Sequence, residues 1–130
     1  MSNLTMPTMT YAALLPKLKE NTVTSIAYST NAKLVDGRIK VYYHGNLIAN
    51  LYEDGSVFIT NASWETPTTR TRLNWILRSN NILWGVTQKD FVQYLACTAA
   101  SDRWYGFYSA EFNKNGTLVR FNGYNAVTGK

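Results

Sequence analysis

The stretch RIKVYYHGNLIANLYEDGSVFIT, residues 38–60, carries the clearest secondary-structure pattern in the chain. Its first residues alternate apolar and polar side chains, as expected of a strand with one buried face. Gly45-Asn46 and Asp54-Gly55 each offer a two-residue turn with the glycine that tight hairpins favour. Two tight turns between three strand-like runs predict an antiparallel three-stranded meander.

Two-residue turns at both sites would fix the strand register by counting, because side chains alternate between the faces of a sheet. Counting places Tyr43 opposite Ile48 and Tyr52 opposite Val57. The face that we expect to form the core is apolar and consists of Ile39, Val41, Tyr43, Ile48, Tyr52, Val57 and Ile59. The other face is mixed and consists of Lys40, Tyr42, His44, Leu47, Ala49, Leu51, Phe58 and Thr60.

The next segment, NASWETPTTRTRLNWILRSN at residues 61–80, has the features of a helix. Thr66 is a suitable N-cap, and Pro67 fits the first helical position because that position needs no backbone N–H. Apolar residues recur at helical spacing through its second half, and Asn80-Asn81 can end the helix. The sequence therefore predicts one main helix over about residues 66–79.

Further strand signals lie on either side of these two segments. Thr22–Ser29 is rich in β-branched residues and is expected to form a strand. After the helix, apolar runs flank Lys89-Asp90 and Asn115-Gly116, which predicts two hairpins. A tight turn in the second hairpin would place Glu111 opposite Arg120, a favourable cross-strand charge pair.

The order of these elements predicts an α+β fold. We expect an antiparallel sheet of about six or seven short strands, with the helix of residues 66–79 packed on one face. The 130 residues suffice for one domain and not for two. We place a flexible arm at residues 1–9, the domain at 10–123 and a tail at 124–130. The domain should begin with a short or kinked helix, because Pro16 lacks the N–H of a helix interior.

Residues that commonly carry catalysis or bind metals are few. His44 is the only histidine and Cys97 the only cysteine, whereas metal sites need several converging ligands. The chain also lacks a G-x-S-x-G nucleophile motif and a glycine-rich loop before a helix. We therefore expect a non-enzymatic protein with no cofactor and no bound metal.

The charge distribution favours an anionic partner. The formal net charge is +5, and the interval between Glu65 and Asp90 contains four basic residues and no acidic one. This interval is the longest acid-free basic segment of the chain, and three of its cations are arginines of the predicted helix. Clustered basic side chains are the electrostatic signature of nucleic-acid binding.

Two surfaces could bind such a partner. On the predicted helix, a projection at 100° per residue places Trp75 and Arg78 away from the apolar side, with Arg72 on the flank and Arg70 at the edge. This side could contact phosphates, whereas the alternative is that Trp75 packs under the arm or the later hairpins. We favour the alternative, because aromatic residues of helices usually belong to the core.

The second surface is the mixed face of the meander. Lys40, Tyr42, His44 and Phe58 place basic and aromatic side chains together, as on sheets that stack unpaired bases. Alternatively, this face is covered by a second layer, which its leucines and its alanine favour. We expect the face to be half covered.

Residues 31–95 resemble a family of small bacteriophage proteins without an assigned activity. In that family a helix opens with Trp-x-Thr-x-Thr-Thr-x-x-Arg-x-Asn. The matching motifs in this chain are His44-Gly45, Ile48-Ala49, Trp64–Asn74 and Gln88-Lys89-Asp90. One departure is Ser63, where the family pattern has glycine. The resemblance implies a phage origin and expression in an infected bacterium, and it assigns no reaction.

Together these patterns predict a small phage accessory protein in the cytoplasm of the infected host. We expect weak binding of DNA or RNA through Lys40, Tyr42, His44, Arg70, Arg72, Trp75 and Arg78. The alternative is a protein that binds and modulates a host or phage protein, with a virion component as a third option. No apolar run is long enough to cross a membrane, and unpaired sheet edges could join two copies of the chain.

Overall fold

The computed structural model describes residues 6–60, 66–82, 84–89, 92–97, 109–111 and 117–119. The helices are α1 (Tyr11–Leu14), the short 3-10 helix η1 (Leu15–Lys17) and α2 (Pro67–Ser79). The strands before α2 are β1 (Thr24–Ala27), β2 (Thr30–Val35), β3 (Arg38–Tyr43), β4 (Asn46–Tyr52) and β5 (Val57–Ile59). The strands after α2 are β6 (Trp84–Lys89), β7 (Val92–Cys97), β8 (Ser109–Glu111) and β9 (Thr117–Val119).

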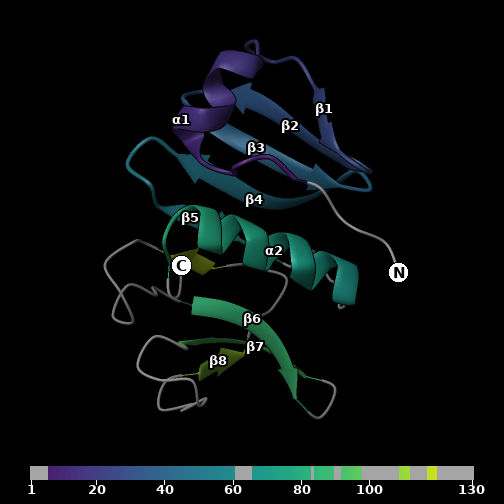
Figure 1. Ribbon diagram of the computed structural model, residues 1–130, viewed down its shortest axis with the longest axis vertical. Coiled ribbons are helices and arrows are strands. Elements are labelled where there is room, and N and C mark those ends of the chain that lie inside the picture. Colours follow the sequence, from purple (N-terminus) through teal and green to yellow (C-terminus); the bar gives the residue numbers. More distant parts are fainter. Residues whose placement is uncertain are drawn as a thin grey trace.

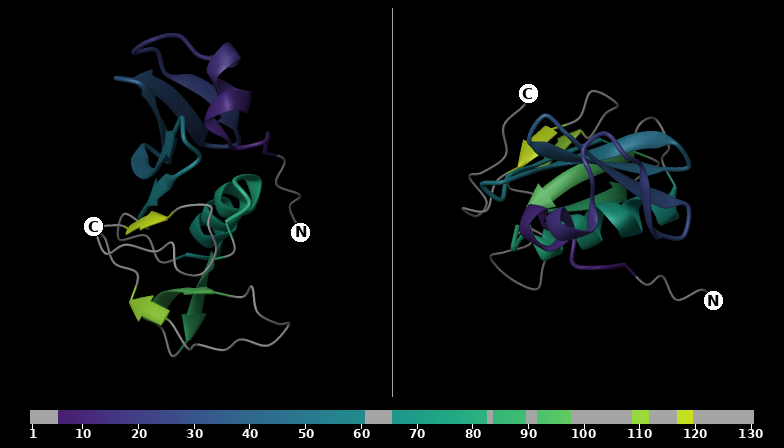
Figure 2. Two further views of the ribbon diagram at one scale, coloured as in Figure 1. Left: turned by 90° about the vertical axis from the view of Figure 1, so that its left-hand side faces the viewer. Right: turned by 90° about the horizontal axis from the view of Figure 1, so that it is seen from above.

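The described strands form two antiparallel sheets. The larger sheet has six strands in the order β1-β2-β3-β4-β5-β9, and the smaller one has three in the order β6-β7-β8. The predicted fold class is confirmed: the fold is α+β, and α2 is the main helix at the predicted position. Helices α1 and α2 lie on the same side of the six-stranded sheet, and β6 runs along the far side of α2 (Figures 1 and 2).

Helix α2 forms where its cap residues predict it. The Thr66 side chain accepts a hydrogen bond from the backbone N–H of Thr69 at 3.3 Å, and Pro67 occupies the first turn. The side of the helix that faces the sheet is buried and consists of Thr69, Arg72, Leu73, Ile76 and Leu77. At the start of the chain Thr10 caps α1 in the same way, and Pro16 lies in η1, so the predicted short helix is confirmed.

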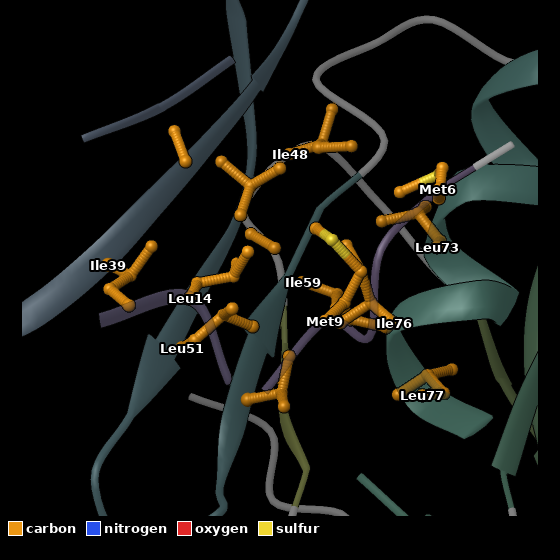
Figure 3. Packing of buried hydrophobic residues seen from close by; sticks show 14 of the residues in the cluster. Met6, Met9, Leu14, Ile39, Ile48, Leu51, Ile59, Leu73, Ile76 and Leu77 are labelled. Carbon is orange, nitrogen blue, oxygen red and sulfur yellow. The ribbon is translucent and has the colours of Figure 1, made fainter. Parts of the chain in front are cut away.

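The core lies between the six-stranded sheet and the two helices (Figure 3). Leu73, Ile76 and Leu77 of α2 belong to the same buried cluster as the inner side chains of the strands. Met9 is fully buried between the sheet and α2, and Asn80 Nδ2 donates to the carbonyl oxygen of Met9 at 2.9 Å. Residues 6–9 therefore pack on the core, whereas residues 1–5 of the predicted arm lie outside the described residues.

The first hairpin turn of the meander lies one residue earlier than predicted. Its central residues are His44 and Gly45, not Gly45 and Asn46, because Tyr43 pairs with Asn46. His44 has φ +51° and Gly45 has φ +80°, and a type I′ turn needs positive φ at both central positions. A non-glycine residue tolerates one such position at modest cost, and histidine is among the residues enriched there.

This shift changes the faces of β4. Val41 pairs with Ala49 and Ile39 with Leu51, so Ala49 and Leu51 face the core. The prediction that they lie on the face of Lys40 is wrong, and Tyr52 is only partly buried instead of belonging to the core. The register also shifts between Val41 and Tyr42, where Ile48 is the extra residue of a β-bulge and is buried.

The second turn has three loop residues instead of two. Tyr52 and Ser56 flank it, since the N–H of Tyr52 donates to the Ser56 carbonyl at 3.1 Å. Gly55 has φ +89° and follows the turn at Glu53 and Asp54, as in a type I turn with a glycine bulge. The Asp54 carboxylate accepts hydrogen bonds from the N–H and the hydroxyl of Ser56, which holds this loop.

Two further strand predictions differ from the structure. Strand β2 was not predicted, although Asp36-Gly37 forms the tight turn that joins it to β3. The predicted hairpin around Asn115-Gly116 is wrong, because β8 pairs with β7 and β9 pairs with β5. Glu111 accordingly lies opposite Tyr94, and Arg120 lies outside the described residues. The predicted strand at Thr22–Ser29 is confirmed as β1, and the predicted hairpin around Lys89-Asp90 is confirmed by the pairing of β6 with β7.

Strand β6 is the edge of the smaller sheet, and a side chain of α2 occupies that edge. Asn74 donates through Nδ2 to the Val86 carbonyl at 3.0 Å and accepts from the Val86 N–H at 2.7 Å. One amide side chain therefore makes the two hydrogen bonds that a neighbouring strand residue would make. Gly85 lies beside this amide, and a Cβ there would be 3.4 Å from Asn74 Oδ1, in van der Waals contact with it.

Candidate nucleic-acid interface

Arg72, predicted on the flank of the outer helix surface, is instead buried with 3% of its surface exposed. Three of its five N–H groups donate to the protein: Nε to the Thr30 hydroxyl at 2.9 Å, Nη1 to the Thr68 carbonyl at 3.0 Å and Nη2 to the Tyr28 carbonyl at 3.0 Å. The placement of Arg72 on an outer surface is corrected: its guanidinium joins α2 to the β1–β2 turn.

The ring of Tyr43 completes this arginine site. The guanidinium carbon of Arg72 lies 3.9 Å from the ring centroid, a cation–π contact, and the Tyr43 hydroxyl donates to the Thr68 hydroxyl at 3.0 Å. Burial lowers the pKa of Arg72, and the neighbouring Tyr43 and Tyr28 act in the opposite direction. An arginine keeps its charge at physiological pH even so, so the hydrogen bonds compensate a permanent buried cation.

Trp75 also serves the fold. It is partly buried against the core cluster, and its indole N–H donates to the carbonyl oxygen of Pro7 at 3.1 Å. This geometry confirms the favoured alternative, in which Trp75 packs under the N-terminal segment. Of the predicted helix cations, Arg78 is exposed and Arg70 is partly exposed.

The outer face of the six-stranded sheet gathers basic and aromatic side chains. We define the basic-aromatic face by the residues on β2, β3, β4 and β5 whose side chains point away from the helices: Lys33, Arg38, Lys40, Tyr42, Tyr52 and Phe58. All six are partly exposed. None of the residues that the described register places on this face is acidic, so its charge is positive throughout.

The centre of this face is a row of directly paired residues. Lys33 on β2 lies opposite Lys40 on β3, Lys40 lies opposite Asn50 on β4, and Asn50 lies opposite Phe58 on β5. Two like charges directly opposite each other on neighbouring strands destabilise a sheet. Within the described part of the chain, neither lysine has an ion pair or a hydrogen bond that would offset this repulsion.

Two polar atoms on the same face also have no partner in the described part of the structure. They are Nε of Arg38 and Oδ1 of Asn50, and both are buried at the atom level. Asn50 itself is only 9% exposed. A buried polar atom without a hydrogen bond costs free energy, so the protein by itself leaves the polar groups of this face incompletely satisfied.

The structure separates the residues that were predicted to bind a partner. Lys40 and Tyr42 lie on the basic-aromatic face, whereas α2 with Arg70 and Arg78 lies on the opposite side of the sheet (Figure 2). His44 is exposed in the turn after β3, with its ring centroid 4.2 Å from that of Tyr43. The two groups of residues therefore do not form one continuous surface.

Sequence reasoning missed four residues of this region: Lys33, Arg38, Asn50 and Tyr52. Lys33 was missed because β2 was not recognised, although Asp36-Gly37 after an alternating run is a hairpin signal. Asn50 and Tyr52 were assigned to the core side because the meander register was one residue out. Arg38 was left out although the alternation within β3 places it on the face of Lys40.

A hollow with a volume of about 380 Å³ opens beside the β4–β5 turn. The side chains and backbone that line it are Thr10, Tyr11, Ala12, Tyr52, Glu53, Asp54, Gly55, Ser79, Asn80 and Asn81. Across the described residues, no three His, Cys, Asp or Glu side chains come together as metal ligands would. In the same part of the chain, no helix has the length and apolar character that a membrane span requires.

The family model for the Kyanoviridae Gp96 protein matches residues 9–125, which is most of the chain. Neither the curated proteins nor the solved structures contain a match.

Proposed function

The chain belongs to the Kyanoviridae Gp96 protein family and is thus a phage protein, and we propose that it binds single-stranded nucleic acid during infection. The binding surface is the basic-aromatic face, and the protein acts without catalysing a reaction. The observation that carries the proposal is the opposed pair Lys33 and Lys40, held beside aromatic rings with no acidic neighbour among the described residues of the face.

Charge supports an anionic ligand. The repulsion between the two lysines is relieved when a phosphate lies between their ammonium groups, because each then has an opposite charge nearby. Arg38 lies on the same face, two residues before Lys40 on β3, so the three cations form a cluster on two neighbouring strands. A nucleic-acid backbone carries several phosphates and can bring one to each cation, which a single anion cannot do.

The aromatic rings support unpaired bases in particular. Tyr42, Tyr52 and Phe58 are partly exposed between the cations, and exposed rings on a sheet stack bases that have left a duplex. A sheet face is also too broad to enter a groove of double-stranded DNA, which admits a helix or a two-stranded ribbon. Single strands should therefore bind more tightly than duplexes of the same sequence.

Fluorescence anisotropy with a labelled mixed-sequence single strand, as DNA and as RNA, tests the proposal directly. We expect binding at low salt, weaker binding to the matching duplex, and a steep loss of affinity as salt rises. Each phosphate contact contributes about 0.7 to the slope of log K against log salt for single strands. Lys40→Glu should reduce that slope by at least about 0.7, whereas Lys19→Glu, an exposed change outside the basic-aromatic face, should leave it unchanged.

The aromatic part of the interface is tested by Phe58→Leu. Leucine keeps an apolar side chain at this partly buried position but removes the ring on which a base could stack. The loss should lower affinity by about 1–3 kcal/mol per stacked base and leave the salt slope unchanged. No binding of single strands by the wild-type protein at low salt would refute the proposed function.

A further inference from the structure

Two polar groups of the basic-aromatic face are shielded from water and have no hydrogen-bond partner among the described residues. They are Nε of Arg38, which is a donor, and Oδ1 of Asn50, which is an acceptor. Buried polar atoms in proteins are almost always paired, so an unpaired one requires an explanation. Asn50 is 9% exposed, and its amide makes no hydrogen bond to the described part of the chain. A ligand that offers both an acceptor and a donor would satisfy the two groups together.

The two groups are neighbours on the sheet. Arg38 on β3 lies opposite Tyr52 on β4, and Lys40 lies opposite Asn50, so Arg38 and Asn50 are diagonal neighbours on one face. Diagonal positions of an antiparallel pair are about 7–8 Å apart, a distance that long side chains can bridge. A planar ring of the size of a nucleobase can therefore contact the guanidinium and the amide at the same time.

The order of acceptors and donors around each base decides which base fits. A guanidinium only donates, and its fork matches two adjacent acceptors, whereas an amide oxygen accepts from N–H groups. Guanine presents the acceptors N7 and O6 side by side, followed by the donors N1–H and N2–H₂, and arginine on N7 and O6 is the commonest specific base contact. Adenine has an amino group in place of O6, and the pyrimidines have no N7. Guanine is therefore the base that satisfies both protein groups.

We propose that Arg38 and Asn50 form a guanine-selective subsite, in which the Arg38 guanidinium donates to N7 and O6 and Asn50 Oδ1 accepts from N1–H or N2–H₂. This inference rests on the proposed function, because the base arrives as part of a bound single strand. Tyr52 lies two residues from Asn50 on β4, and Phe58 lies opposite Asn50 on β5. Both rings are partly exposed and offer stacking surfaces for the bound base and its neighbour.

Lys40 connects the subsite to the phosphate contacts. It faces Asn50 from β3 and Lys33 from the other side. The lysine side chain is a flexible four-carbon stem, so its ammonium can follow a phosphate away from Asn50. Binding of the strand then uncovers the amide that reads the base, and a free phosphate without a base gains nothing from Asn50.

The test is fluorescence anisotropy with a labelled oligothymidylate that carries one central guanine, adenine or cytosine. The wild-type protein should bind the guanine strand about ten-fold more tightly than either of the others. Two guanine analogues divide this preference between its contacts, since inosine lacks the 2-amino group and 7-deazaguanine lacks N7. Each analogue should lower the affinity by about three- to ten-fold, the effect of one lost hydrogen bond.

Two variants assign each contact to its residue. Arg38→Lys keeps the charge but not the fork, so this variant should no longer distinguish 7-deazaguanine from guanine and should still distinguish inosine. Asn50→Ala removes the amide oxygen and should show the reverse pattern. Arg78→Lys, the same conservative change at an exposed position of α2, should keep both distinctions. Thermal melts verify that each variant is folded.

The outcomes separate this inference from the proposed function. Equal wild-type affinity for the guanine, adenine and cytosine strands would overturn the subsite and leave single-strand binding in place, whereas no binding to any of the strands would overturn both. A guanine preference that both folded variants retain in full would also overturn the subsite. If a variant does not fold, the analogues decide with the wild-type protein alone, because undiminished affinity for inosine and 7-deazaguanine contradicts the proposed contacts.

Discussion

The two sides of the six-stranded sheet both hold arginine, and the contrast shows how differently a cation can serve a protein. On the helix side, Arg72 is buried, donates three hydrogen bonds to the protein and lies over the ring of Tyr43. On the outer side, Nε of Arg38 has no described partner, and Lys33 and Lys40 oppose each other. One cation holds the fold together, whereas the others lie on the outer face without a described partner.

Removing Arg72 should have the largest effect on stability. Arg72→Ala removes three hydrogen bonds and a cation–π contact and opens a cavity beside Tyr43. The free energy of unfolding should fall by about 3–5 kcal/mol, since the lost hydrogen bonds and the cavity each contribute. Urea denaturation measures the loss, and Arg78→Ala provides a control at an exposed helix position, where a change within about 0.5 kcal/mol is expected.

A smaller effect should follow from Trp75→Phe, which keeps a ring but removes the donor to the Pro7 carbonyl. The expected loss is about 0.5–1.5 kcal/mol of unfolding free energy, the usual net contribution of one hydrogen bond. Nucleic-acid affinity should not change, because α2 lies on the side of the sheet away from the basic-aromatic face. A large drop in affinity with unchanged stability would instead show that Trp75 belongs to the binding surface.

The smallest expected change in stability is a gain, and it distinguishes the two sides of the sheet most clearly. Lys40→Glu converts the repulsive pair with Lys33 into an attractive one, so the protein should become more stable by about 0.2–1 kcal/mol. The same change should weaken nucleic-acid binding. A residue whose replacement stabilises the fold and removes binding is retained for function, and a destabilised Lys40→Glu variant would argue against the repulsive pair.

The fold could be predicted from local signals wherever one signal determines the element. Thr66, Pro67 and the apolar spacing of α2 give the helix and its buried side, and they do so without tertiary information. The register of the meander could not be predicted, because Gly45 fits either central position of a tight turn. Positive φ at His44 places the turn one residue earlier, and one residue exchanges the faces of a strand.

Which residues share the candidate site depends on the register of the meander more than on composition. Arg72 is charged, and a helical projection places it on the flank of the outer side of the helix, yet the side chain is buried. Its burial follows from acceptors that come from the β1–β2 turn, more than 40 residues earlier in the chain. Lys40 and Tyr42 were identified correctly as members of one sheet face, because the alternation within β3 is a local property.

The packing of residues 6–9 constrains the order in which the chain can fold during synthesis. These residues leave the ribosome before α2 does, yet Pro7 and Met9 are held by Trp75 and Asn80, 68 and 71 positions later. The amino-terminal segment therefore has no docking site until α2 has emerged, and the core closes only when most of the domain has been translated. Until then Met6 and Met9 are apolar side chains that a chaperone or a nascent neighbour can contact, so this segment joins the core only after α2 has been made.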